Sequence, residues 1–163
     1  MSDRHPIRLT INGRLVERTV EPRTLFVDFL REGLGLTGTH VGCEHGVCGA
    51  CTIIVDGDSV RACLMFAVQA DGAIVQTVES LGTGEAMHPL QQRFQQHHAL
   101  QCGFCTPGML MTSLDVLQKH PHSNDAQVRE HLSGNLCRCT GYQHIVAAVR
   151  AALADALATE AAK

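Results

Sequence analysis

Residues 43 to 51 read CEHGVCGAC, so three cysteines fall within one short, glycine-containing stretch. A fourth cysteine follows after eleven residues, which gives C-x4-C-x2-C and a distant C. This is the plant-type spacing for a 2Fe–2S cluster. A loop around such a cluster turns its N–H groups inward, and glycines at 42, 46 and 49 permit the conformations required. The stretch therefore predicts one cluster with four thiolate ligands: Cys43, Cys48, Cys51 and Cys63.

Other chemistries agree less well with this spacing. Structural zinc commonly uses two short C-x2-C knuckles of similar type, which this stretch lacks. A Rieske centre needs two histidine ligands, and Cys43-Glu44-His45 supplies only one, so we interpret His45 as a solvent-facing loop residue. A disulfide would leave the glycines without a role. The segment GLGLTG at 33–38 matches a dinucleotide fingerprint but follows a predicted helix instead of a strand, so we interpret it as a turn.

A second group of four cysteines lies in QCGFCTPG and NLCRCTGY. The spacing is C-x2-C, thirty-one residues, then C-x-C, formed by Cys102, Cys105, Cys137 and Cys139. Predicted helices begin after both motifs, and two helix N-termini at one site favour an anion such as a thiolate-bound 2Fe–2S cluster of net charge roughly −2. CGFC also resembles a thioredoxin dithiol, but that motif belongs beside a βαβ unit, which is not predicted here. Taken alone, this second motif leaves zinc open as an alternative.

The bulk composition narrows the classes of protein that are possible. The chain has 163 residues, which is one domain or two small ones, and its aromatic content of 4% predicts a thin core that a metal would stabilise. The net charge of −3 without a basic patch argues against nucleic-acid binding. The N-terminus has no apolar signal region, and no run is long enough to span a membrane, so we predict a cytoplasmic protein. Eight cysteines in that compartment favour metal or redox chemistry over disulfides.

The pattern of the chain changes near residue 80. Residues 1–80 are predicted to be β-rich, with hairpins at Asn12-Gly13, Asp56-Gly57 and Asp71-Gly72. Cys63 is predicted on a strand, and the one helix is predicted at Thr24–Glu32. Thr24 would cap this helix, and its apolar face would comprise Leu25, Phe26, Phe29 and Leu30.

Residues 81–87 are predicted to be a linker, and residues 88–163 a bundle of four amphipathic helices. The apolar spacings that indicate the helices are Leu90 and Phe94; Leu110, Leu114 and Leu117; Val128 and Leu132; and Ile145, Val149, Leu153 and Leu157. Met109 and Met111 are interpreted as bundle core, and the tail from residue 154 is predicted to fray. The fold class is therefore α+β, with four cysteines in each half.

Together, GCEHGVCGACT, QCGFCTPGM and GNLCRCTGYQ resemble the small iron–sulfur subunits of the molybdenum hydroxylases, the xanthine oxidase family. The likeness covers about residues 5 to 155, and all eight cysteines match the family pattern. Among bacterial members the chain is most similar to the small subunits of carbon monoxide dehydrogenase and of hydroxylases of quinoline-like N-heterocycles. The loop residues EHGV favour the second type.

The resemblance implies a β-grasp, ferredoxin-like N-terminal domain and a four-helix C-terminal domain, each with one 2Fe–2S cluster. It implies a large subunit with molybdopterin, carrying cytosine dinucleotide, and a medium FAD subunit, in a dimer of heterotrimers. Gln101 would hydrogen-bond the pterin, and Cys139 would lie against it. Electrons from water-dependent hydroxylation of a small N-heteroaromatic substrate would pass through the helical-domain cluster, then the β-domain cluster, to FAD.

No side chain of this chain is predicted to act as a substrate acid or base, so the predicted role is electron transfer alone. The surfaces around both clusters are expected to be apolar and covered by partners. Two other classes remain as alternatives. One is a free-standing diferredoxin-type electron carrier or redox sensor, and the other is an interaction module stabilised by zinc.

Overall fold

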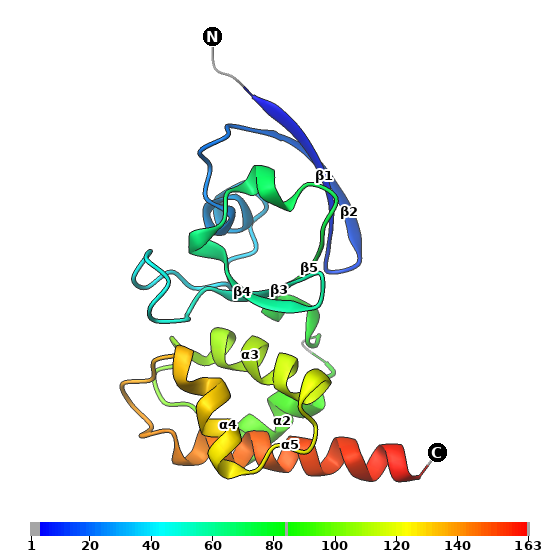
Figure 1. Ribbon diagram of the computed structural model, residues 1–163, viewed down its shortest axis with the longest axis vertical. Coiled ribbons are helices and arrows are strands. Elements are labelled where there is room, and N and C mark those ends of the chain that lie inside the picture. The colour runs from blue at the N-terminus through cyan, green and yellow to red at the C-terminus, as the bar shows by residue number, and fades with distance from the viewer. Residues whose placement is uncertain (1–3, 84, 163) are drawn as a thin grey trace.

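The computed structural model describes residues 4–83 and 85–162, in two halves stacked along the long axis of the molecule (Figure 1). The N-terminal half contains five strands and the C-terminal half four helices within the described residues. The strands are β1 His5–Ile11, β2 Arg14–Val20, β3 Thr52–Val55, β4 Asp58–Arg61 and β5 Ile74–Gln76. The helices are α1 Phe26–Asp28, α2 Pro89–Gln96, α3 Thr106–Lys119, α4 Asp125–His131 and α5 Gln143–Ala161, with α1 in the N-terminal half.

The five strands form one mixed sheet in the order β2-β1-β5-β3-β4. Asn12-Gly13 and Asp56-Gly57 make the β1–β2 and β3–β4 hairpins, and all four residues have positive φ, as tight two-residue turns require. β5 pairs parallel to β1 and antiparallel to β3, so the chain returns to the middle of the sheet. The predicted α+β class with a β-grasp first half is confirmed.

The third predicted hairpin, at Asp71-Gly72, is wrong. Residues Ala67–Ala70 form a 3₁₀ helix instead of a strand, and the turn leads from it into β5. The Gly72 N–H donates to the Arg8 carbonyl at 2.7 Å, and the Arg8 N–H donates to Asp71 Oδ1, also at 2.7 Å. A turn is therefore present at Asp71-Gly72 as predicted, but its hydrogen bonds join it to β1, which is distant in sequence.

The predicted helix at Thr24–Glu32 is shorter and less regular than expected. α1 covers only Phe26–Asp28 and continues as a π-helical turn over Phe29–Gly33, and Thr24 does not cap it. Leu25 instead bridges to Phe66, while the Ala67 N–H donates to the Thr24 carbonyl at 2.8 Å. Because this extended pairing holds residues 24–25 as strand, the helix can begin only after them. The apolar face is nevertheless buried, including Phe26, Phe29 and Leu30.

Cys63 lies in a 3₁₀ helix, Ala62–Leu64, and not on the strand where it was predicted. β4 ends at Arg61 because its partner β3 begins at Thr52, the residue opposite. The Ala62 N–H then donates to the Cys51 carbonyl at 3.2 Å. The chain therefore turns at the last ladder pair and places Cys63 beside Cys51.

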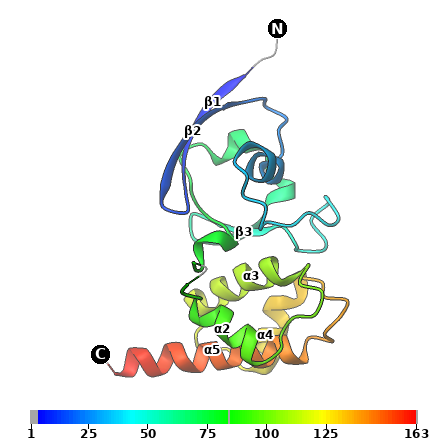
Figure 2. The same ribbon diagram turned by 180° about the vertical axis from the view of Figure 1, so that it is seen from behind.

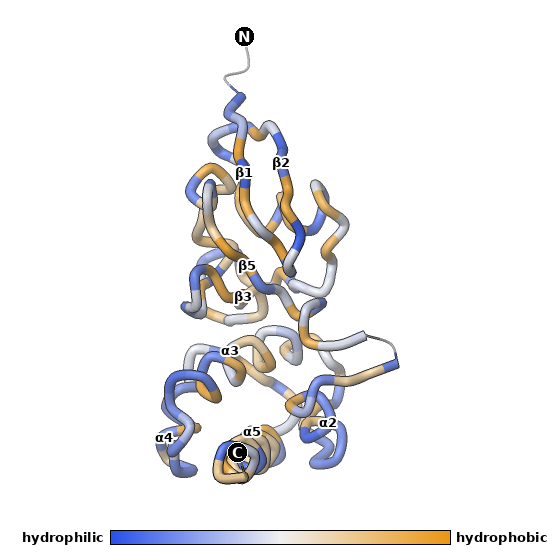
Figure 3. The backbone as a smooth tube through the Cα atoms, turned by 90° about the vertical axis from the view of Figure 1, so that its right-hand side faces the viewer, coloured by the Kyte–Doolittle hydropathy of each residue, from blue (hydrophilic) through white to orange (hydrophobic). Residues whose placement is uncertain are grey.

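The C-terminal half is the predicted set of four helices. Seen from the side, α5 runs beneath α3, with α2 and α4 on either side of it (Figure 3). The core contains most of the predicted apolar residues, including Met109 and Met111, and Leu117 packs against it. Three details differ from the prediction. Leu157 is partly exposed and lies outside this core, Leu132 begins a 3₁₀ turn after α4, and α5 continues to Ala161 instead of fraying from residue 154.

The two halves share β3 as a boundary. Ile53 packs into the core of the sheet, whereas its neighbour Ile54 packs into the helical core, because successive strand residues point to opposite faces. α3 lies directly against β3 (Figures 1 and 2). Residues 1, 84 and 163, which belong to the predicted domain limits and linker, lie outside the described residues. No helix of the described chain combines the length and the apolar character needed to cross a bilayer.

Candidate metal centres

The first four cysteines lie around the end of the β3–β4 ladder and in the loop that precedes it. Cys51 directly precedes β3, and the β3–β4 ladder brings Cys63 next to it; both side chains are buried. Cys43 and Cys48 are half-buried in the preceding loop, where the Cys48 N–H donates to Cys43 Sγ at 3.4 Å. The loop thus supplies two outer thiols and the sheet two inner ones. His45 is exposed, as predicted.

Cys43 and Cys51 of this first site have pKa values shifted in opposite directions. Backbone N–H groups of His45, Cys48 and Val47 lower the pKa of Cys43 to about 6, so the loop presents donors to a thiolate. Burial, followed by the neighbouring Cys63 and Cys48 thiols, raises the pKa of Cys51 to about 11. A buried thiolate at Cys51 therefore needs a bound cation to offset the loss of hydration. This combination suits a metal centre that is held between a donor-rich loop and an apolar sheet edge.

Glycines are needed where this first loop approaches its neighbours. Gly46 and Gly49 have φ of +80° and +70°. A Cβ at Gly46 would lie 2.4 Å from Leu64, and one at Gly49 would lie 2.4 Å from the carbonyl oxygen of Gly134. A Cβ at Gly42 would lie 3.0 Å from Cys48 Sγ. The glycines predicted to permit a tight cradle therefore do so, and Gly49 also permits contact with the helical half.

The second four cysteines lie in two loops at one end of the bundle. Cys102 and Cys105 lie between α2 and α3, and Cys137 and Cys139 lie between α4 and α5. Cys102 Sγ and Cys139 Sγ are 3.5 Å apart and exposed, whereas Cys105 and Cys137 are half-buried against the helical core. α3 begins directly after Cys105, as predicted, but three residues separate Cys139 from α5.

The thiols of this second site also divide into inner and outer members. Burial, and then the adjacent Cys137, raises the pKa of Cys105 to about 12. The pKa of Cys137 is lowered because, although burial opposes it, hydrogen bonds from the Thr140 hydroxyl and amide outweigh burial. Those two contacts are 3.1 and 3.5 Å from Cys137 Sγ. The backbone amide of Phe104 lowers the pKa of Cys102. The hydrogen bond between the Cys139 and Cys102 thiols raises the pKa of Cys139.

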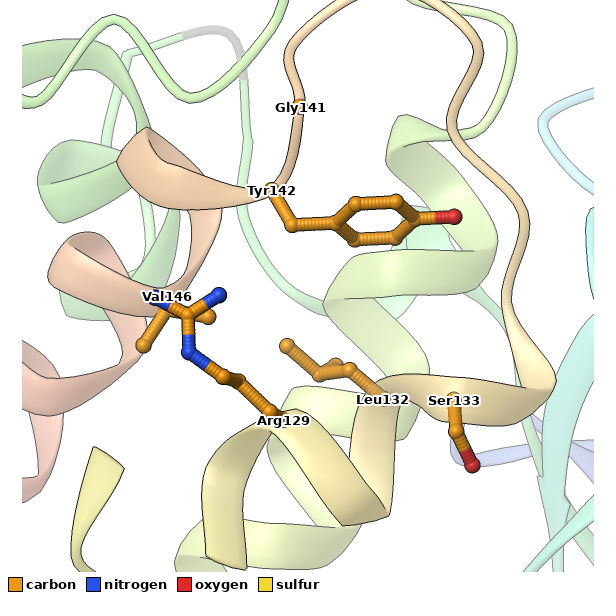
Figure 4. Close-up of a pocket in the computed structure, with 6 residues that line it drawn as sticks. All are labelled: Arg129, Leu132, Ser133, Gly141, Tyr142 and Val146. Carbon is orange, nitrogen blue, oxygen red and sulfur yellow. The ribbon is translucent and has the colours of Figure 1, made fainter. Parts of the chain in front are cut away.

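Tyr142 is a residue of this site that the sequence reasoning missed. It has φ of +67°, which is rare for a residue with a side chain, and its hydroxyl accepts a hydrogen bond from the Cys137 N–H at 2.9 Å. Its ring lies across a cavity of about 250 Å³ (Figure 4). The cavity is lined by Arg129, Leu132, Ser133, Gly141, Tyr142 and Val146. The left-handed turn thus directs the phenol inward, where it holds the loop that carries Cys137.

The donor set of both sites agrees with thiolate-held metal clusters. Each site combines four cysteines whose thiols influence one another, and all eight are free thiols. The hydroxyl of Thr106, next to Cys105, is buried without a partner, whereas the matching Thr140 hydroxyl contacts a thiol. Across residues 4–83 and 85–162, no three His, Cys, Asp or Glu side chains converge as one single-ion site. A thiolate-bound 2Fe–2S cluster would offer its sulfides as hydrogen-bond acceptors to Thr106.

The loops that carry the two groups of cysteines lie on the same side of the molecule, one on each half (Figures 1 and 2). His40 Nδ1 donates to the carbonyl of Phe104 at 2.8 Å, and the two rings stack with centroids 5.1 Å apart. Gln101 is exposed beside Cys102, on the same surface as Cys139. Gln101 and Cys139, the residues expected to meet the pterin, are therefore both accessible from outside.

Comparison with known proteins gives two consecutive family matches along the chain. Residues 9–75 match the model of a 2Fe–2S iron-sulfur cluster binding domain, and residues 77–150 match that of a [2Fe-2S] binding domain. The chain is 58% identical over 149 residues to caffeine dehydrogenase subunit gamma of Pseudomonas sp. (strain CBB1), covering 90% of this chain and 89% of that one. It is 54% identical over 148 residues to the nicotine 6-hydroxylase small subunit of Paenarthrobacter nicotinovorans, covering 91% and 89%.

Among solved structures, a chain of quinoline 2-oxidoreductase from Pseudomonas putida 86 matches with a TM-score of 0.92 and 52% identity. The match covers 97% of this chain and 98% of that chain. The likeness therefore extends over both halves and both cysteine groups.

Proposed function

The chain belongs to the small 2Fe–2S subunits of the xanthine oxidase family of molybdenum hydroxylases, and we propose how its residues perform electron transfer there. The observation that carries the proposal is the presence of four neighbouring thiols in each of two domains that both match 2Fe–2S models. In the proposal Cys43, Cys48, Cys51 and Cys63 hold one cluster, and Cys102, Cys105, Cys137 and Cys139 hold the other. Each cluster, when bound, supplies one-electron transfer at iron.

The residues around the thiols would tune this transfer. Backbone N–H groups directed at Cys43, and the Thr140 hydroxyl at Cys137, stabilise negative charge on sulfur. Burial at Cys51 and Cys105 acts in the opposite direction. Hydrogen bonds to sulfur and burial are the levers by which a protein sets a cluster potential. We therefore expect two clusters of different potential in one chain.

The proposed direction is from a molybdopterin in a large subunit, through the helical-domain cluster and the β-domain cluster, to FAD in a medium subunit. Exposed Gln101 and Cys139 would contact the pterin, which we propose carries cytosine dinucleotide. Large apolar side chains are exposed along the chain beside each group of cysteines. They are Leu100, Phe104 and Leu136 beside the second group, and Val47, Leu64 and Phe66 beside the first. Such surfaces are typical of protein contacts and support separate partner subunits.

We propose a dimer of heterotrimers in the cytoplasm, where eight free thiols would remain reduced until they are loaded. The proposed reaction of the complex is water-dependent hydroxylation of a small N-heteroaromatic substrate. Caffeine dehydrogenase, nicotine 6-hydroxylase and quinoline 2-oxidoreductase each name a nitrogen heterocycle, which supports this class.

Co-purification and metal analysis test this proposal. The tagged chain should bring down two larger partners, and the complex should oxidise quinoline with an oxygen atom that comes from labelled water. The chain should contain roughly four irons with matching acid-labile sulfide and give two distinct EPR signals on reduction. A single 17.6-kDa species that carries all activity would support the free carrier, and zinc without labile sulfide would support the interaction module.

A further inference from the structure

One hydrogen bond joins the two cysteine sites directly. The Leu136 N–H donates to the Cys48 carbonyl at 2.8 Å. Cys48 belongs to the first group of thiols, and Leu136 is bonded to Cys137 of the second. The backbones of one cysteine from each group are therefore connected by a short run of covalent bonds and one hydrogen bond.

The residue before Leu136 holds this contact in place. Asn135 is 1% exposed, and its amide nitrogen donates to the Gly49 carbonyl at 3.0 Å and to Thr52 Oγ1 at 3.2 Å. Its amide oxygen accepts from Thr112 Oγ1 at 2.9 Å and from Arg61 at 3.3 Å. The amide therefore uses both donors and both acceptor positions. Its partners come from the first cysteine loop, from β3 and β4, and from α3.

Arg61 ties the same contact to the sheet. It donates to Thr52 Oγ1 and to the Gly134 carbonyl, both at 2.7 Å, and it lies two residues before Cys63. The network thus touches the chain next to cysteines of both groups. A fully satisfied buried polar network has directional contacts, so it specifies one relative arrangement of the parts that it joins.

From this geometry we infer that Asn135, supported by Arg61, is a positioning residue for electron transfer between the two clusters. It fixes the Leu136 N–H on the Cys48 carbonyl, and so fixes both the separation of the clusters and the bonded route between them. An apolar contact would also hold the halves together, but its lack of direction would allow them to slide. The inference depends on the cluster assignment proposed above.

The test uses the full chain loaded with both clusters and compares the wild type with Asn135→Ala and Arg61→Lys. In the fully reduced protein, each cluster carries an unpaired spin, and magnetic coupling between the two spins splits both EPR signals. This splitting falls steeply as the distance between the two clusters increases. Asn135→Ala should retain both signals and full iron, but show a clearly smaller splitting and severalfold slower electron equilibration between clusters after flash reduction. Arg61→Lys keeps the charge but not the fork of donors, and should show the same changes to a smaller extent.

Thr77→Val is the control because it removes a buried hydroxyl whose bonds, among the described residues, are to Asn12 and Glu79 and to no cysteine or Asn135 partner. It should lose stability without changing the splitting. Unchanged splitting and transfer in Asn135→Ala and Arg61→Lys, or loss of iron in both, would overturn the inference, since the network would then serve only folding. If the wild type itself lacks two clusters, the cluster assignment fails instead, so the two failures are distinguishable.

Discussion

Gly49→Ala is the substitution for which the structure gives the clearest expectation. Gly49 has φ of +70°, and a Cβ there would lie 2.4 Å from the Gly134 carbonyl oxygen and 2.7 Å from the Asn135 amide nitrogen. The left-handed backbone costs an L residue about 1–2 kcal/mol. The methyl group must also push the Gly134–Asn135 backbone away from the first cysteine loop.

The second effect can be separated from the first with a matched control. Gly72 has φ of +80°, but a Cβ there would meet nothing within 4 Å, so Gly72→Ala reports the cost of conformation alone. Moving residues 134–135 weakens the bonds from Asn135 to Gly49 and from Arg61 to Gly134, each worth roughly 0.5–3 kcal/mol. Gly49→Ala should therefore be less stable than Gly72→Ala by ~1–4 kcal/mol.

The assay is anaerobic urea denaturation of the loaded chain, followed both by circular dichroism and by the visible absorbance of the clusters. Gly49→Ala should lower both transition midpoints relative to Gly72→Ala, and should release the clusters earlier. If the two variants denature together, the close approach at Gly49 contributes nothing to stability, and the role assigned to this contact between the halves is refuted.

Three further predictions concern separate parts of the molecule. Cys48→Ser and Cys105→Ser should each lose or distort one cluster, measured as loss of one EPR signal and of about half the iron, while the other signal remains; two variants with full iron would refute the ligand assignment. Tyr142→Phe removes the acceptor for the Cys137 N–H and should cost about 1 kcal/mol of stability. It should also shift the potential of the helical-domain cluster only, and a shift of the other cluster would contradict this. Arg93 of α2 lowers the pKa of Asp155 of α5 through two bonds of 2.6 Å, so this pair stabilises the fold above the unfolded pKa of about 3.9 and not below the lower folded value. Asp155→Asn should therefore cause a small loss of stability at pH 7 that disappears on acidification, as measured by thermal unfolding across pH.

Local features of the sequence predicted local features of the structure. Asn12-Gly13 and Asp56-Gly57 form their turns because the required positive φ is a property of those residues. Thr24 failed as a helix cap because Leu25 is paired with Phe66, which is distant in sequence. The glycine cradle at Gly46 and Gly49 was likewise predictable from spacing.

The supporting residues could not be predicted because their roles depend on tertiary contacts. In the sequence, Asn135 looks like any loop amide and Arg61 like any strand cation. Their hydrogen bond forms only because the two halves are in contact. Tyr142 gave a weak signal, since a tyrosine after glycine and before a helix does not reveal a left-handed backbone. Motif spacing thus identifies thiols, whereas the groups that orient them follow only from the assembled fold.

The close contact between the halves also favours the proposed electron-transfer subunit of a complex over a free-standing electron carrier. A Cβ at Gly108, in the first turn of α3, would lie 2.2 Å from the Gly49 carbonyl oxygen, so helix and cysteine loop meet backbone to backbone. Farther along α3, Asp115 binds Ser59 at 3.0 Å and Lys119 binds Asp58 at 2.6 Å. The interface therefore combines close packing with directional polar bonds. A carrier that docks alternately with two partners needs only one exposed centre, whereas two cysteine sites on one side of a closely packed chain support the proposed contact with a donor subunit and an acceptor subunit.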